Sequence, residues 1–81
     1  MYLEIITPDK KVFSGEVVVA TFPGSKGSFQ VLNNHAPLIS TLDRGKISIR
    51  TAQGEQSLIV DGGVVEVLNN QIIVLAEAVI G

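Results

Sequence analysis

Short stretches in which apolar and polar residues alternate follow one another along the chain, separated by groups of turn-forming residues. In residues 46–51, Ile47 and Ile49 fall on one side of an extended chain and the polar residues on the other, the period-two pattern of a half-buried strand. Gly54 then offers a residue that accepts positive φ, and residues 56–60 return as a second strand. These segments predict a β-hairpin.

Turn signals of the same kind recur along the whole chain. They are Pro8-Asp9, Ser14-Gly15, Pro23 to Gly27, Asn33-Asn34, Asp43 to Gly45, Asp61 to Gly63 and Asn69-Asn70. The glycines at 62 and 63 also fit a bulge or a close approach of the backbone. Between the turn signals, the runs 16–22 and 71–76 are rich in Val and Ile and barely alternate, a pattern typical of strands buried on both faces or of helix segments. Their shortness and β-branching favour strands. The chain is therefore predicted to be all-β, a small antiparallel β-sandwich of about ten short strands in a single domain over residues 1–81.

Composition restricts the partners of this domain. The net charge is −2, and the six Lys and Arg residues are scattered, so the chain lacks the basic surface on which nucleic-acid binding depends. The absence of Cys removes thiolate nucleophiles and thiolate metal sites. Hydrophobic residues make up 46% of a domain too small to bury them all, which predicts that some apolar surface meets a protein partner.

The first residues predict a strand and not a targeting segment. An acid at Glu4 and the lack of a basic stretch argue against a secretion signal. The longest apolar run, 71–80, is interrupted by Glu77 and is far shorter than the ~20 residues that cross a bilayer. We expect a soluble chain located in the cytoplasm.

Reactive groups are few. The chain has one His, no Cys and carboxylates that are dispersed along the sequence, so no acid-base pair is indicated and no metal site or cofactor is expected. His35 is read as a loop histidine without a catalytic role. The predicted protein is not an enzyme.

Lys26 supports one alternative. It stands between Ser25 and Gly27 in a turn, and biotinyl and lipoyl carrier domains are small all-β modules that carry a modified lysine in such a place. The flanking residues that mark those carriers are absent here. A second alternative, a ligand-binding or adhesion sandwich, is disfavoured because the chain has few aromatic residues to line a pocket.

A resemblance to a known family covers nearly the whole chain. Residues 23–40, with the sequence PGSKGSFQVLNNHAPLIS, resemble the epsilon subunit of rotary ATP synthases. Thr7-Pro8 with residues 12–17 resembles the opening of that family, and residues 62–67 with 73–76 resemble its closing strands. The matching segments occur in the order and spacing of the family.

The resemblance implies a ten-stranded β-sandwich that couples and does not catalyse. Such a subunit binds the gamma subunit, sits on the polar loops of the membrane ring of c subunits, and is present as one copy per complex. It helps rotation driven by ion flow to reach the head where ATP is made. The implied location is the cytoplasmic face of the bacterial inner membrane, peripheral through the complex and without insertion into lipid.

Contact residues follow from the same resemblance. The c-ring is expected to contact Ser28, Phe29, Asn33, Asn34, His35 and Ala36. The gamma subunit is expected to contact Thr7, Ser40, Thr41 and Leu42. Many family members continue into a C-terminal helical hairpin that restrains ATP hydrolysis. Because nothing in this sequence follows Gly81, we expect a short form without that hairpin and without its inhibition.

Overall fold

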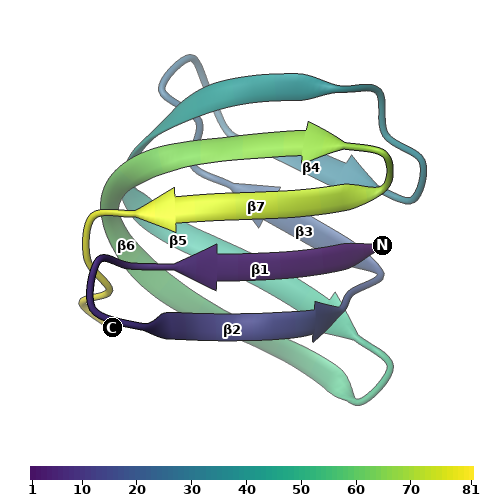
Figure 1. Cartoon of the computed structure of the whole chain (residues 1–81), viewed down its shortest axis with the longest axis horizontal. Coiled ribbons are helices and arrows are strands. Elements are labelled where there is room, and N and C mark those ends of the chain that lie inside the picture. Colours follow the sequence, from purple (N-terminus) through teal and green to yellow (C-terminus); the bar gives the residue numbers. More distant parts are fainter.

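Seven strands and no helix make up the computed structural model, which describes all residues 1–81 (Figure 1). The strands are β1 (Tyr2–Ile6), β2 (Lys11–Glu16), β3 (Val19–Phe22), β4 (Phe29–Leu32), β5 (Leu38–Thr51), β6 (Gly54–Leu68) and β7 (Gln71–Ala76). All are hydrogen-bonded into one sheet in the order β2-β1-β7-β6-β5-β3-β4. The structure has no helix long and apolar enough to cross a membrane.

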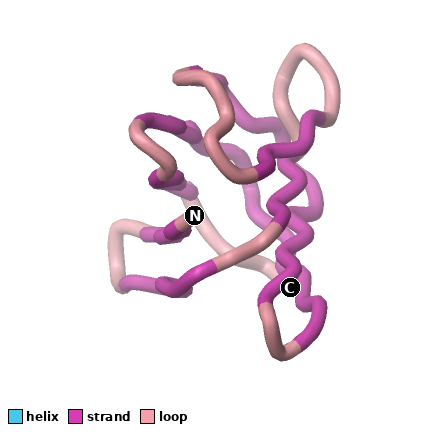
Figure 2. Tube along the Cα trace, turned by 90° about the vertical axis from the view of Figure 1, so that its right-hand side faces the viewer, coloured by secondary structure: helices cyan, strands magenta, loops and turns pink.

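The long strands β5 and β6 turn this sheet into two layers. They pair with each other from Leu38–Val67 to Thr51–Gly54, and the register is interrupted near Asp43 and Gly62. On one side of this bend β6 pairs with β7, and on the other side β5 pairs with β3. The first layer therefore contains β2, β1, β7, residues 63–68 and residues 38–42, and the second contains residues 54–60, residues 44–51, β3 and β4 (Figures 1 and 2).

The predicted all-β sandwich is confirmed, but it has seven strands where about ten were expected. Three groups interpreted as turns between strands lie inside strands: Ser14-Gly15 in β2, and Asp43 to Gly45 in β5 and Asp61 to Gly63 in β6, where both long strands bend. Positive φ at Gly62 and Gly63, 86° and 149°, makes that bend possible. The other interpretation of Gly62 and Gly63, as a bulge or a close approach of the backbone, is confirmed, because the pairing of β5 with β6 is interrupted there and Gly63 lies against the backbone of Leu75 and Ala76. One pairing is also parallel, that of β1 with β7.

The core lies between the layers and is entirely apolar. Its sixteen residues form one cluster, with no buried polar or charged residue. Phe22 is its largest fully buried side chain, and its ring centroid lies 5.6 Å from that of the half-buried Phe29. The other members are Met1, Leu3, Ile5, Val17, Ala20, Val31, Leu42, Ile47, Ile49, Val60, Val65, Val67, Ile72, Val74 and Ala76.

The two Val- and Ile-rich runs do form strands, but not strands buried on both faces. In β7 the side chains of Ile72, Val74 and Ala76 are buried and the residues between them are exposed. In the other run Glu16 is the last residue of β2, and Val19–Phe22 forms β3 with a similar alternation of buried and half-buried residues. Both runs belong to layers that are covered on one side only, so their outer apolar residues reach the surface.

Candidate functional site

The loops gather at two opposite ends of the sandwich. The N-terminus, the β2–β3 connection, residues 33–37, the β5–β6 hairpin and the β6–β7 turn lie on the right in Figure 1. The β1–β2 turn, residues 23–28, the bend of β5 and β6 and the C-terminus lie on the left. The predicted ring contacts occur at both ends, residues 33–36 at the first and Ser28 at the second.

The six residues predicted to contact the ring fall into two groups. Ser28 and Phe29 stand at the start of β4, and residues 33–36 follow its end. A strand of four residues is roughly 13 Å long, so the groups are separated by that distance. Both groups adjoin β4, which is an edge strand of the sheet and pairs only with β3.

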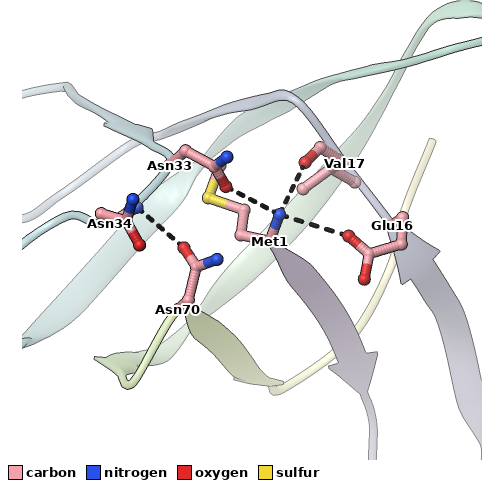
Figure 3. A network of polar contacts seen from close by, with 6 residues as sticks. All are labelled: Met1, Glu16, Val17, Asn33, Asn34 and Asn70. Carbon is pink, nitrogen blue, oxygen red and sulfur yellow. Dashed lines mark hydrogen bonds and ion pairs between the residues drawn. The ribbon is translucent and has the colours of Figure 1, made fainter.

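Residues 33–36 are held by a polar network around the chain's N-terminus (Figure 3). The Met1 ammonium donates to Asn33 Oδ1 at 2.9 Å and to the Val17 carbonyl at 3.3 Å, and it lies 3.2 Å from Glu16 Oε2. The Asn34 backbone N–H donates to Asn70 Oδ1 at 2.8 Å. The loop is thus tied to β1, to β2 and to the β6–β7 turn.

His35 is oriented within the same loop. Its backbone N–H donates to the Leu32 carbonyl at 3.1 Å, and its Nδ1 lies 2.7 Å from the Ala36 carbonyl oxygen. A carbonyl oxygen only accepts hydrogen bonds, so Nδ1 is the nitrogen that carries the proton. The other ring nitrogen, Nε2, is then an acceptor in the neutral side chain.

The loop of Ser28 packs beside the predicted gamma contacts on β5. The backbone N–H of Ser25 donates to the Thr41 carbonyl at 3.0 Å, and Thr41 Oγ1 donates to Ser25 Oγ at 2.9 Å. A bridge between Gly24 and Leu42 continues this pairing. The structure therefore brings one predicted ring contact and two predicted gamma contacts to the same region. Lys26 is exposed in this loop.

The gamma contacts lie on β5 and just after the end of β1, both in the first layer. Thr7 directly follows β1, and its hydroxyl donates to the Lys10 carbonyl at 3.2 Å. Thr41 is exposed on β5, whereas Leu42 is buried and Ser40 is half-buried. The registers of β1, β7, β6 and β5 place Ile6, Leu75, Val64 and Thr41 in one row across the sheet.

Between β1 and β5 the outer surface of the first layer is mainly apolar. Ile73 and Leu75 of β7 are its centre, and the exposed fraction of Leu75 is 56%. On β5, Ile39 is 73% exposed. We define the apolar face as Tyr2, Ile39, Val64, Leu68, Ile73 and Leu75. The outer surface of the second layer instead carries Thr21, Gln30, Lys46, Ser48, Arg50 and Ser57. An extended apolar patch on only one of two outer surfaces indicates an interaction site.

Carboxylates give the apolar face a negative charge. Glu4 and Glu66 stand on either side of Ile73 in neighbouring strands. Lys11 Nζ lies 2.8 Å from Glu4 Oε2, and this hydrogen bond, with the attraction of the carboxylate, raises the pKa of Lys11 above its usual value. Glu66 belongs to none of the ion pairs in the structure. A complementary surface would be apolar and would carry positive charge opposite Glu66.

This face was not predicted from the sequence. Its signal was nevertheless present in residues 71–76, where apolar residues occupy both sides of a short strand. In a domain that buries only one side of that strand, the second apolar side needs a partner outside the chain.

The chain matches a sequence model described as "ATP synthase, Delta/Epsilon chain, beta-sandwich domain" over residues 1–81. It is 45% identical over 75 residues to the chloroplastic ATP synthase epsilon chain of Cyanidioschyzon merolae, covering 93% of this chain and 57% of that one. To the epsilon chain of Dichelobacter nodosus it is 42% identical over 74 residues, covering 90% and 52%. To that of Chlorobium limicola it is 42% identical over 78 residues, covering 95% and 89%. The chain thus spans a little over half the length of the first two relatives.

Two solved structures share the fold. A chain in the central stalk and c-ring structure of the Tetrahymena thermophila mitochondrial ATP synthase superposes with a TM-score of 0.85 at 17% identity, covering 98% of this chain and 64% of that chain. A chain in the Euglena gracilis mitochondrial ATP synthase structure gives a TM-score of 0.89 at 18% identity, covering 96% and 51%. At these identities the likeness concerns the fold alone.

Proposed function

Because the chain belongs to the family of the ATP synthase delta/epsilon chain β-sandwich domain, we propose that it is a non-catalytic coupling subunit in the central stalk of a rotary ATP synthase. It links the gamma subunit to the c-ring, as one copy per complex, so that rotation driven by ion flow reaches the catalytic head. It acts at the cytoplasmic face of a bacterial inner membrane and makes no contact with lipid. The observation that carries this proposal is the apolar face on one side of the sandwich.

Gamma covers the apolar face. Thr7 follows β1 and Thr41 lies on β5, and β7 and β6 with their exposed side chains lie between these two strands. The predicted gamma contacts are then the border of the interface, and Ile73 and Leu75 are its centre. Leu42 supports the face from within, because its side chain is buried in the core. An apolar centre with a polar border is the usual anatomy of a stable protein interface.

The ring lies along the edge of β4. A surface that follows this edge strand meets Ser28 at one end and residues 33–36 at the other, which explains how residues roughly 13 Å apart can serve one partner. The free backbone groups of an edge strand also suit polar loops, because they offer both donors and acceptors. Phe29 supports the start of this edge strand, because its ring packs against that of the buried Phe22.

The two surfaces belong to different layers that share the same long strands. The apolar face is in the first layer and β4 is in the second, and β5 and β6 run without interruption through both. A close-packed core between the layers resists their displacement. This stiffness suits a part that transmits torque. The coupling role needs only these residues, whereas an inhibitory helical hairpin forms no part of residues 1–81.

The test uses co-expression with the gamma subunit of the same organism. We expect the unaltered chain to elute with gamma as a one-to-one complex on size exclusion. Leu75→Lys should weaken that complex at least about tenfold, because it removes a central apolar contact worth roughly 1.5–3 kcal/mol and places an unpaired charge there. The chain should remain folded, since Leu75 is exposed.

Ser48→Lys is the matched control, because it introduces the same side chain on the polar outer surface of the second layer. Separate elution of gamma and the unaltered chain would contradict the proposed function. The intact mass of the protein from its native source would then show whether Lys26 carries a cofactor. If Leu75→Lys and Ser48→Lys weakened the complex with gamma equally, gamma would not bind the apolar face.

A further inference from the structure

We propose that the outer surface of the second layer binds a sugar phosphate, a small phosphate ester that also carries hydroxyl groups. Lys46 attracts the phosphate, and hydroxyl and amide side chains of β3 to β6 hold the rest of the ligand. The site does not depend on the proposed coupling function, because it lies in the layer that does not contain the apolar face. β3 and β4 are the fainter strands behind β1 and β7 in Figure 1, so this surface faces away from the viewer there.

An open cavity of about 350 Å³ lies over four strands of this layer. Ten residues line it and only two of them are hydrophobic, so it suits a small polar ligand. Its centre is a row of paired residues on β4, β3, β5 and β6, namely Gln30, Thr21, Ser48 and Ser57. Neighbouring strands lie about 4.8 Å apart, so the row is roughly 14 Å long.

Half of the six basic residues of the chain lie on the outer side of β5. They are Arg44, Lys46 and Arg50, at alternate positions of the strand. Because Ile47 and Ile49 are buried in the core, the side chains at the even-numbered positions point away from it. Ser48 is one of these positions, so the basic residues stand on both sides of the polar row along β5.

Lys46 is the basic residue of this surface that has no carboxylate beside it. On β6, Glu55 Oε2 lies 3.1 Å from the guanidinium of Arg50, and Asp61 stands opposite Arg44 in the register. Lys46 belongs to none of the ion pairs, and its register partner is an isoleucine. Three cations and two carboxylates leave the surface with a positive charge, which attracts an anion.

The side chains of the row, like that of Lys46, make no hydrogen bond within the chain. Hydroxyl and amide groups can both donate and accept, whereas the Lys46 ammonium only donates. Hydrogen bonds to an ionised oxygen are the stronger ones, so the phosphate binds beside Lys46 and Ser48. Thr21 and Gln30, farther along the row, then meet the hydroxyl groups of the sugar. A ligand with both kinds of group matches the whole row.

Titration of the isotope-labelled chain with glucose-6-phosphate, followed by amide NMR spectra at constant ionic strength, tests the site. We expect saturable shifts of the amides of the row, with half-saturation at about 1 mM or below. Inorganic phosphate lacks the hydroxyl groups and should bind at least about threefold more weakly. Vesicles that contain phosphatidylglycerol, which present their phosphates on a surface, should leave the same amide signals unchanged.

Two substitutions separate the two ends of the ligand. Lys46→Gln should weaken the binding of both soluble ligands at least about tenfold, because it removes the cation. Gln30→Ala should abolish the advantage of glucose-6-phosphate but keep the affinity for inorganic phosphate within about twofold. Lys26→Gln is the matched control, since it removes the same charge from an exposed lysine that does not line the cavity. It should bind both ligands like the unaltered chain.

Absence of saturation at about 20 mM glucose-6-phosphate would overturn the site. Equal losses in Lys46→Gln and Lys26→Gln would also overturn it, because only the net charge would then matter. Shifts caused by vesicles but not by the soluble ligands would identify a membrane contact in place of a ligand site. Co-elution with gamma is measured separately, so a chain that joins gamma but binds no ligand keeps the proposed function and loses only this site.

Discussion

Phe22→Ala is expected to lower the free energy of unfolding by about 3–5 kcal/mol, because it leaves a cavity at the centre of the only core. The side chain of Phe22 is fully buried, and its ring packs against Phe29 with centroids 5.6 Å apart. A domain of this size has a total stability of roughly 4–12 kcal/mol. The substitution therefore removes a large part of it, and urea denaturation followed by circular dichroism measures the loss.

Phe22→Leu is the companion variant. Leucine keeps most of the buried apolar volume but loses the aromatic contact with Phe29, so its cost should be nearer 1 kcal/mol. A loss below about 1 kcal/mol for Phe22→Ala would mean that the surrounding side chains collapse into the space, and it would contradict the tight packing described for the two layers.

Gly63→Ala is the second substitution with a large expected effect, about 3 kcal/mol or more. Gly63 has φ of 149°, and an added Cβ would overlap the Leu75 carbonyl oxygen and lie 2.9 Å from the Ala76 Cα. Both obstacles belong to the backbone of β7, which cannot move without opening its pairing with β6. Strain of the backbone alone costs roughly 1–3 kcal/mol, and the clash adds to it. Thermal unfolding of the purified variant measures the total.

Gly54→Ala separates the two contributions. Gly54 has φ of 135° in the β5–β6 hairpin, but nothing lies within 4 Å of an added Cβ. It should lose only the strain, roughly 1–3 kcal/mol. If the two variants lost equal stability, the close approach of β7 to the bend would not be the reason that residue 63 is glycine.

Local patterns predicted those parts of the fold that depend on neighbouring residues. The hairpin over residues 46–60 is present as the pairing of β5 with β6, and Asn34, Asn69 and Asn70 do adopt positive φ in predicted turns. The sequence indicated a bulge or close backbone approach at Gly62 and Gly63, but the bend in β5 at Asp43 to Gly45 could not be distinguished from a turn, because the same Asp and Gly residues serve in both. The parallel pairing of β1 with β7 joins residues from the two ends of the chain, and no local pattern encodes it.

The candidate site was predictable to a different degree on its two surfaces. Residues 33–36 were identified through the family resemblance, and their hydrogen-bond partners required the fold, since Met1 and Asn70 are distant in sequence. The apolar face was missed because a run such as 71–76 looks the same whether its second side meets another layer or solvent. Only the arrangement of layers shows that Ile73 and Leu75 are outside.

The parallel pairing of β1 with β7 also determines when the protein can finish folding during its synthesis. β1 emerges from the ribosome first, yet one of its two neighbours in the sheet is the last strand to be made. The hairpin of β5 and β6 can form as soon as it emerges, because its contacts are local, whereas the first layer must wait for Gln71–Ala76. Until then Leu3 and Ile5, which end fully buried, lack a cover on one flank. A nascent chain stalled before β7 is therefore expected to be sensitive to proteases, and release of the complete strand should make it resistant.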